Sequence, residues 1–455
     1  MEDQKNFITF VVLATIIVMI YMTFFGQQAA DRVQDETTAA QQLAEIEAQN
    51  QTVELKPRED VVQTGQRIAI ETPSLSGSFL VQGSRFDDIT LKKYRQTIAE
   101  DSPGVVLLTP EGVENAAYIS DNWAIVDRGT GAESNWQLIS GDRLTPENSV
   151  IMRLENDGYT VDRTVSIDDR YLITLNDRIT NTSGSDITLN RFGFARQHGI
   201  PKGDGDARDV SFILHQGATA IIDGKQTNHS YKKFDKKPRL TLYGPGGWVG
   251  LTDKYWLSAA IAPQGDNITA DFSYRKLNDA KIFESSYKTE PVTLTPGVSV
   301  DSVGYIFAGA KDRSTLVKYE KEIGIAQMER AIDWGRLRLL TRPMNWLISK
   351  FYGLLGNYGL AIIALTTLIK LVLFPIFNRQ YASQAKMKKV APKQKKLQEL
   401  YKDDRVRLQQ EVMALYKKEG VNPLAGCLPI IPTIFVFFAL YKTCLLYTSP
   451  SPRDA

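Results

Sequence analysis

Residues 358–377 read YGLAIIALTTLIKLVLFPIF, an apolar run in which Lys370 is the one charged side chain. A helix of about 20 residues rises about 30 Å, which is the thickness of the hydrocarbon core of a bilayer. Two further runs have the same character, since residues 7–25 are uncharged and residues 427–447 contain a single charge at Lys442. The sequence therefore predicts three transmembrane helices. The alternative for residues 7–25 is a cleaved signal peptide.

The formal net charge of +2 conceals a strong local asymmetry. Residues 378–420 contain twelve Lys or Arg against five Asp or Glu, so the rest of the chain is net acidic. Short loops rich in Lys and Arg stay in the cytoplasm, so this segment is expected inside the cell. Counting back one span places residues 26–345 outside, and counting back another places the N-terminus in the cytoplasm. We therefore expect a multi-pass membrane protein whose large domain lies outside the cytoplasm, which is the periplasm in a bacterium with two membranes.

Residues 66–309 consist of short β-branched and aromatic stretches separated by turn residues. Apolar and polar residues alternate most clearly at 159–167 (YTVDRTVSI) and at 171–179 (YLITLNDRI). Such segments, repeated over about 240 residues, predict a large antiparallel β-sandwich. Residues 311–331 have helical spacing, so helices are expected to close this domain.

The segments that flank the β-region differ from it in composition. Residues 27–62 are rich in Gln, Ala, Glu, Asp and Thr and have too little apolar surface to pack, which predicts a tether. Residues 332–350 interleave Trp and Arg with Leu, which is typical of an amphipathic helix in the membrane interface. The alternative is a surface helix packed on the β-domain. Residues 392–401 and 405–418 predict an antiparallel helical hairpin.

These observations divide the chain into eight predicted segments. In order they are a transmembrane anchor (1–26), a periplasmic tether (27–62), a periplasmic β-domain with closing helices (63–331), an interfacial helix (332–350), a second transmembrane helix (351–378), a cytoplasmic basic hairpin (379–420), a third transmembrane helix (424–443) and a tail (444–455).

Lys370 is the candidate functional residue within the membrane. It lies thirteen residues into its run, which is about 10 Å from the cytoplasmic end of a helix. An ammonium group at that depth costs about 2.5 to 3.5 kcal/mol, so it is expected to face protein or a water-filled cavity. Thr366 and Thr367 lie one turn earlier on the same face and would extend a polar stripe. The alternative is a lysine whose long side chain reaches the cytoplasmic interface.

No sequence pattern points to an enzyme. The three histidines, His198, His215 and His229, fall in the β-region without metal-ligand spacing, and no P-loop, HExxH or GxSxG pattern occurs. The two cysteines, Cys427 and Cys444, lie in the third apolar run, so no disulfide framework is expected. We therefore predict a protein that is not an enzyme and has no cofactor and no metal.

Five stretches of the chain resemble a known family. They are FDDITLKKYRQTI from Phe86, DWGRLRLLTRPM from Asp333, NYGLAIIALTTLIKLVLFP from Asn357, QYASQAKMKKVAPK from Gln380 and MALYKKEGVNPLAGCLPI from Met413. In order and spacing, from residue 1 to about 443, they resemble the Gram-negative branch of the YidC/Oxa/Alb family of membrane protein insertases. The resemblance implies an energy-independent insertase and folding chaperone for nascent membrane proteins, which works alone or with the Sec translocon.

The resemblance also implies an architecture and a site. Family members have a five-helix core around a polar groove, preceded in this branch by an extra anchor helix and a periplasmic β-supersandwich. The groove carries one basic residue, and that position falls on Lys370, with Thr366 one turn before it. Relatives often carry a glutamine on the third helix where this chain has Thr433. The proposed groove residues are therefore Lys370, Thr366, Thr367 and Thr433.

The lysine-rich hairpin suggests a second contact surface. Its lysines are expected to contact the ribosome, anionic phospholipids or the emerging chain. The residues are Lys386, Lys388, Lys389, Lys393, Lys395 and Lys396. The alternative is a solvated topology signal that binds no partner.

Two other functional classes are weighed against the insertase. The family's supersandwich is similar to that of sugar mutarotases, which suggests a membrane-tethered periplasmic sugar-binding protein or mutarotase-like enzyme. Such an enzyme needs a histidine and carboxylate set in a cleft, and the sparse histidines argue against it. A transporter or channel would call for repeated helix sets, and only one run carries a charge at its centre.

Residues 444–455 (CLLYTSPSPRDA) match nothing in the family. We interpret them as a cloning, sequencing or assembly artefact, which would leave three of six expected transmembrane helices.

Overall fold

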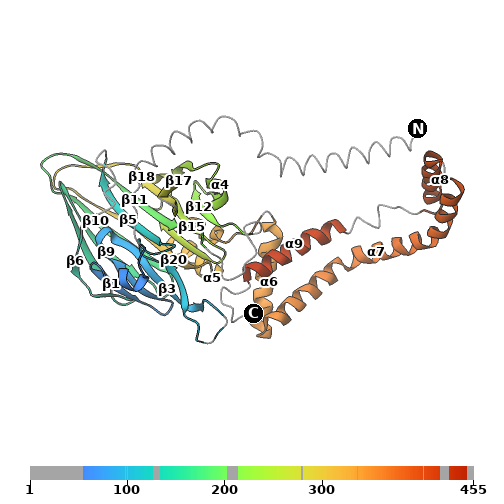
Figure 1. Ribbon diagram of the computed structural model, residues 1–455, viewed down its shortest axis with the longest axis horizontal. Helices are drawn as coiled ribbons and strands as arrows, with labels where there is room; N and C mark the ends of the chain where they lie inside the picture. Colours follow the sequence, from blue (N-terminus) through green and yellow to red (C-terminus); the bar gives the residue numbers. More distant parts are fainter. Residues whose placement is uncertain are drawn as a thin grey trace. The chain divides into compact units, whose positions relative to one another are not determined.

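The computed structural model describes residues 55–97, 99, 101–126, 134–201, 214–277, 280–335, 337–402, 404–420 and 430–447. The predicted first span and residues 27–54 of the predicted tether lie outside the described residues. The chain forms two compact units, a β-rich unit that ends at Ala331 and a helical unit that begins at Ile332 and is assigned residues 96–102 and 210–214 as well (Figure 1). The prediction of a β-rich domain followed by a helical region is confirmed.

The β-rich unit contains two sheets within the described residues. The first has eleven strands, in the order β14 (Arg239–Pro245), β17 (Asn267–Leu277), β18 (Ala280–Thr289), β11 (Ile187–His198), β5 (Ala117–Ile125), β3 (Arg85–Arg95), β2 (Leu75–Leu80), β1 (Arg67–Glu71) and β7 (Arg143–Leu144), with β19 (Val292–Leu294) on β11 and β4 (Gly104–Leu108) on β3. The second has nine, in the order β13 (Lys225–Ser230), β12 (Gly217–Ile222), β15 (Gly247–Thr252), β16 (Trp256–Ile261), β20 (Ser299–Ala310), β10 (Leu172–Asn181), β9 (Tyr159–Ile167), β8 (Val150–Asn156) and β6 (Trp136–Ser140). Apart from the parallel pair β1–β7, the described pairings are antiparallel.

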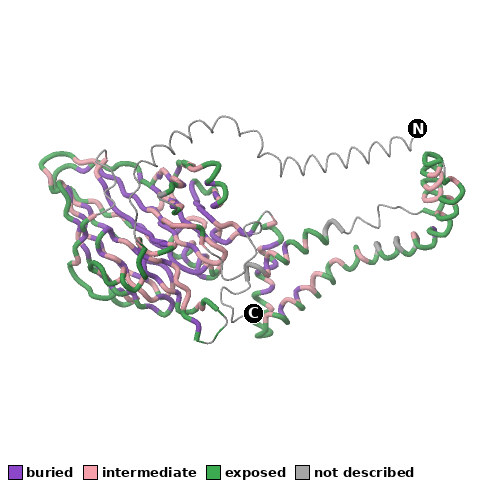
Figure 2. Tube along the Cα trace, in the orientation of Figure 1, coloured by how far each residue is buried: buried purple, intermediate pink, exposed green. Residues whose placement is uncertain are grey.

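Sequence alternation determines which residues form the core. In β9 every second residue is buried, from Tyr159 to Ile167, because successive side chains of a strand point to opposite faces. The two sheets contact each other through β11 with β15 and β16, and through β5 with β16. Figure 2 shows buried positions running along the strands of both sheets. The facing sides of the two sheets therefore form a sandwich core.

Short helices complete the β-rich unit. They are α3 (Arg58–Val61), η1 (Gln82–Ser84), α4 (Tyr231–Phe234), α5 (Arg313–Lys318), the π-helical turn η3 (Tyr319–Ile323) and η4 (Met328–Ala331). The side chain of Asp312 caps α5 by accepting a hydrogen bond of 2.9 Å from the Thr315 N–H. The Trp248 indole donates to the Ala326 carbonyl at 3.1 Å, which fastens the closing segment to β15. Helices close the domain where the spacing of residues 311–331 predicts them.

The helical unit consists of α6 (Arg338–Leu355), α7 (Tyr358–Leu400), α8 (Arg405–Lys418) and α9 (Ile430–Tyr447) among the described residues. The α6 helix packs against α7 and α9. The break between α6 and α7 lies a few residues later than the predicted boundary at 350. The reason is local, since Gly356 ends α6 in the left-handed region at φ 65° and the Asn357 side chain accepts from the Leu360 N–H at 3.1 Å to begin α7.

The α7 helix continues beyond the apolar run for 43 residues in all, with Pro375 and Pro392 inside it. Residues 392–400, which were expected to be the first helix of the hairpin, form the last part of this long helix. Each proline removes one backbone donor, but the helix continues through both positions. The return helix α8 lies along the end of α7, where Lys393 pairs with Glu419 at 2.6 Å and the Tyr416 hydroxyl donates to Gln394 at 3.1 Å.

Candidate functional site

Lys370 lies in the apolar part of α7. Among the described helices, one segment is long and apolar enough to cross a membrane, namely Tyr358–Asn378, with 21 residues and a mean hydropathy of 2.4. Lys370 is its thirteenth residue, and its side chain is exposed. Within the described part of the chain the ammonium group has no hydrogen-bond or ion-pair partner. A charge in such a helix requires water or a polar group from elsewhere.

Two threonines share the turn that precedes Lys370. The Thr366 hydroxyl donates to the Ile362 carbonyl at 2.8 Å, and the Thr367 hydroxyl donates to the Ile363 carbonyl at 2.9 Å. Bonding back to the helix satisfies each hydroxyl proton, which lowers the cost of placing these residues in an apolar environment. The lone pairs of each hydroxyl oxygen remain able to accept a hydrogen bond.

The opposite side of α7 is packed. Ala361 and Leu365 are buried and form a core with Met344 and Ile348 of α6 and with Ala439 of α9. Lys370 lies outside this core. Leu371 and Val372, which follow it, are 66% and 67% exposed. The helix therefore presents a packed face, an exposed apolar face and the short polar stripe of Thr366, Thr367 and Lys370.

Thr433 lies near the start of α9, and its side chain is exposed. Both α7 and α9 contact α6, so Lys370 and Thr433 lie on two helices that share a neighbour. Within the described residues no hydrogen bond joins these two side chains. The structure thus brings three of the four predicted groove residues together on one helix and leaves Thr433 on another.

Polar contacts that the sequence analysis did not identify join α9 to α6 and to the segment just before α6. Lys442 forms an ion pair of 2.9 Å with Asp333, and the two side chains are only 12% and 23% exposed. The buried Thr443 hydroxyl donates to the Ala439 carbonyl at 2.8 Å. The sequence did contain a signal for the ion pair, because Lys442 is the one charged residue in the apolar run 427–447 and a charge there requires a partner.

The basic hairpin presents its lysines to solvent. The described ones are exposed, namely Lys388, Lys389, Lys393, Lys395 and Lys396, whereas the side chain of Lys386 lies outside the described set. Lys393 is paired with Glu419 and lowers the pKa of that carboxyl group. The remaining lysines form a positively charged surface that can bind a polyanion.

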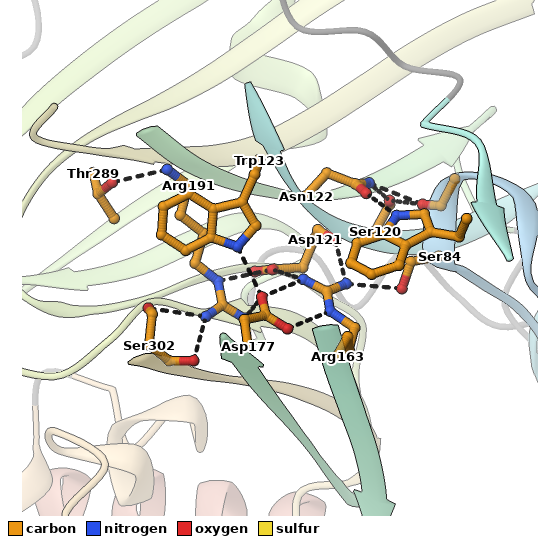
Figure 3. Close-up of polar contacts among 12 residues, drawn as sticks. Ser84, Ser120, Asp121, Asn122, Trp123, Arg163, Asp177, Arg191, Thr289 and Ser302 are labelled. Carbon is orange, nitrogen blue, oxygen red and sulfur yellow. Dashed lines mark hydrogen bonds and ion pairs between the residues drawn. The ribbon is translucent and has the colours of Figure 1, made fainter. Parts of the chain in front are cut away.

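The core of the β-rich unit contains a cluster of buried charges that the sequence analysis did not find (Figure 3). Arg163 of β9 pairs with Asp177 of β10 at 2.7 Å, and Arg191 of β11 pairs with Asp121 of β5 at 2.8 Å. Between the sheets, Arg163 lies 3.1 Å from Asp121, and the Trp123 indole donates to Asp177 at 2.8 Å. All four charged side chains have no exposed surface.

The cluster is electrically balanced, with two guanidinium groups against two carboxylates. Burial alone would raise the pKa of Asp177, but Arg163 and Arg191 hold that pKa below its usual value. Burial would lower the pKa of Arg191, yet Asp121 and Asp177 raise it above its usual value. Because the charges are enclosed and mutually paired, the cluster joins the two sheets and is not accessible to a substrate.

A cavity of about 290 Å³ opens in the β-rich unit. Its lining includes Asn115, Arg196, Tyr231, Asp253 and Trp256. Arg196 is already paired with Glu284. No histidine is among the described residues that line it, and no cluster of potential metal ligands occurs in the described part of the chain. The described lining thus has the carboxyl groups of Glu114 and Asp253 without a histidine beside them.

Comparison with known proteins covers both units. A family model described as the YidC periplasmic domain matches residues 67–347, and one described as the 60Kd inner membrane protein matches residues 350–451. The chain is 39% identical over 457 residues to the membrane protein insertase YidC of Maricaulis maris, across 97% of this chain and 76% of the relative. It is 32% identical over 494 residues to that of Bradyrhizobium diazoefficiens, across 100% of this chain and 79% of the relative.

A galactose mutarotase related enzyme from Lactobacillus acidophilus is similar at 11% identity and a TM-score of 0.38, across 53% of this chain and 97% of that one. A likeness of that size is too distant to imply a shared activity.

The matches define an inner-membrane protein with a β-rich periplasmic domain followed by a helical region. Its relatives are named insertases. The chain belongs to the YidC family of membrane protein insertases, and the resemblance drawn from its sequence is confirmed.

Proposed function

We propose that this chain inserts nascent proteins into the inner membrane and assists their folding by means of a hydrated groove beside α7. The supporting observation is Lys370, an exposed ammonium group at the thirteenth position of a 21-residue apolar segment, without a partner among the described residues. An ammonium group in such a segment is tolerated when water reaches it. Membership of an insertase family supplies the context for this charge.

The proposed mechanism is electrostatic. Moving a polar or acidic segment into hydrocarbon without a hydrogen-bond partner costs several kcal/mol. A groove that holds water and a fixed positive charge lowers this cost, because the segment keeps part of its hydration and is attracted to Lys370. Thr366 and Thr367 extend the polar surface on α7, and Thr433 would line the groove from α9. The apolar part of the substrate slides along α9 into lipid. Because the groove lowers the free-energy cost of moving the polar segment, no nucleotide is needed.

The proposed topology places the N-terminus and the basic hairpin in the cytoplasm and the β-domain in the periplasm. The excess of Lys and Arg in residues 378–420 supports this orientation. The exposed hairpin lysines are then available to the ribosome, to anionic phospholipids and to the emerging chain. Components of the Sec translocon are proposed as further partners.

The test compares Lys370→Ala with Lys370→Arg in cells depleted of their own insertase. Arginine keeps the positive charge and alanine removes it. We expect Lys370→Arg to support growth and insertion of a small Sec-independent membrane protein. Lys370→Ala should reduce the rate of insertion by roughly tenfold or more. Loss of the attraction to Lys370 raises the barrier to transfer, and each increase of about 1.4 kcal/mol slows the step tenfold.

Lys350→Ala is the matched control, because Lys350 is an exposed lysine within α6, outside the proposed groove. It should behave as the unmodified protein when all variants accumulate to equal levels. Normal insertion by Lys370→Ala would show that Lys370 has no role in insertion and that its side chain only reaches the membrane surface.

A further inference from the structure

The β-rich unit carries a dense basic segment next to a short helix. Residues 231–239 (YKKFDKKPR) contain four lysines and one arginine against a single aspartate. Tyr231 and Phe234 of α4 are buried, whereas the basic side chains of the segment are exposed. The α4 helix therefore holds this segment on the fold by its aromatic residues and directs its charges to solvent.

A second basic segment lies against the first. Lys281 of β18 pairs with Asp235 at 2.8 Å, and the Tyr274 N–H of β17 donates to the Pro238 carbonyl at 2.9 Å. The exposed Arg275 follows Tyr274 in the same hairpin. The surface formed by the two segments is called here the α4 basic surface. Its members are Lys232, Lys233, Lys236, Lys237, Arg239, Arg275, Lys276 and Lys281.

The α4 basic surface has a large charge excess. Residues 231–239 and 271–281 together carry eight basic and three acidic side chains, an excess of five positive charges. Two of the acids are paired with members of the surface, since Asp235 binds Lys281 and Asp271 lies 3.2 Å from Arg239. Like charges this close repel one another, and an anionic partner relieves that repulsion.

The framework beneath the charges is well packed. The Phe234 ring lies 4.4 Å from the His229 ring and 5.3 Å from that of Phe283, and the Tyr231 ring lies 4.6 Å from that of Phe283. His229 also bonds the Lys237 carbonyl at 2.9 Å. The lysines therefore project from a fixed backbone, so binding costs less conformational entropy than it would for a flexible tail.

One β-strand separates the α4 basic surface from the point where the chain leaves the β-rich unit. Arg330 donates to the Gly224 carbonyl at 3.0 Å, at the turn that begins β13. The six residues of β13 lead directly into α4 and span about 20 Å. From Ala331 the chain reaches the apolar segment of α7 at Tyr358 within 27 residues. The same chain therefore carries both this surface and an apolar segment long enough to cross a membrane.

We propose that the α4 basic surface binds the anionic phospholipid headgroups of the membrane that holds α7. This inference rests on the membrane insertion of α7 in the proposed function. A lipid surface offers many phosphates in one plane, and each lysine or arginine near it is attracted. Because the domain is tethered to the same membrane, its effective concentration at the lipid surface is high, and weak individual contacts suffice.

The test uses the full chain in lipid nanodiscs, one set of phosphatidylcholine alone and one set with a quarter of phosphatidylglycerol. Hydrogen–deuterium exchange of residues 231–239 is measured in both. We expect exchange to be at least threefold slower in the anionic nanodiscs and to return to the neutral-lipid rate in 0.5 M salt, since screening weakens these contacts. The fourfold variant Lys232→Glu, Lys233→Glu, Lys236→Glu and Lys237→Glu should show no slowing.

A control changes four exposed basic residues of the same unit outside this surface. It combines Lys93→Glu, Arg143→Glu, Arg178→Glu and Lys288→Glu. It alters the net charge equally and should keep the slowing, and both variants should unfold at the temperature of the unmodified protein.

Equal exchange in the two kinds of nanodisc would overturn the proposal. So would slowing that appears only after an acidic protein is added, because the partner would then be a protein. The Lys370→Ala growth assay is independent of this measurement, so a failed insertion mechanism and a failed lipid contact can be told apart.

Discussion

Replacing Asp177 by alanine removes one of the two carboxylates from the buried cluster of the β-domain. Asp177 accepts from Arg163 through two contacts of 2.7 Å and from the Trp123 indole at 2.8 Å, and its side chain has no exposed surface. The substitution leaves two buried guanidinium groups with one carboxylate. Breaking a buried ion pair on one side typically costs about 3 to 5 kcal/mol.

The assay is urea unfolding of the full chain in detergent, followed by tryptophan fluorescence. Trp123 and Trp136 both lie at the cluster, the latter with its ring 4.5 Å from the Arg163 guanidinium, so their emission should report its disruption. The double variant Asp177→Leu with Arg163→Met removes an opposite pair of charges and should lose less stability than Asp177→Ala alone. A loss below about 1 kcal/mol for Asp177→Ala, or an equal loss in the double variant, would refute this account of the cluster.

Three further predictions concern single positions. Burial lowers the pKa of His229, so the folded state favours the neutral ring, and β-domain stability should fall as pH drops from about 6.5 through the folded pKa. A His229→Gln variant should show a flatter pH dependence in unfolding titrations. Gly304→Ala places a Cβ 2.5 Å from the Arg191 guanidinium and should cost about 1 to 3 kcal/mol in the same unfolding assay, with unchanged stability contradicting the packing. Asp333→Asn removes the charge partner of Lys442 and should lower stability by about 0.5 to 1 kcal/mol, whereas Asp333→Glu should retain most of it.

The strands were predictable because burial follows a two-residue period. The alternation at 159–167 places Val161, Arg163 and Val165 on one face, and all three are buried in β9. The alternation in the sequence therefore placed the charged residue Arg163 at a position that faces the core. Its partner Asp121 was not, because it lies 42 residues away on the other sheet and only the long-range pairing of strands brings the two together.

The helical region was predictable in outline and less so in its boundaries. A charge in an apolar run identified Lys370, and the helical repeat placed Thr366 and Thr367 beside it. Helix was predicted at residues 351–378 and 392–401 but not for the residues between them, and the structure shows one continuous helix from Tyr358 to Leu400. The ion pair of Lys442 with Asp333 depends on the packing of α6 on α9, which local sequence signals do not determine.

The central claim is that water reaches position 370 within the membrane. Lys370→Cys and Val372→Cys are made separately in a background with Cys427→Ser and Cys444→Ser, and the full chain in lipid is treated with a thiol reagent that does not dissolve in bilayers. Val372 is the control because it is apolar and lies two turns after Leu365, on the opposite side of α7 from Lys370. We predict rapid labelling at position 370 and little at 372. Equal protection of both positions would contradict a hydrated groove beside α7.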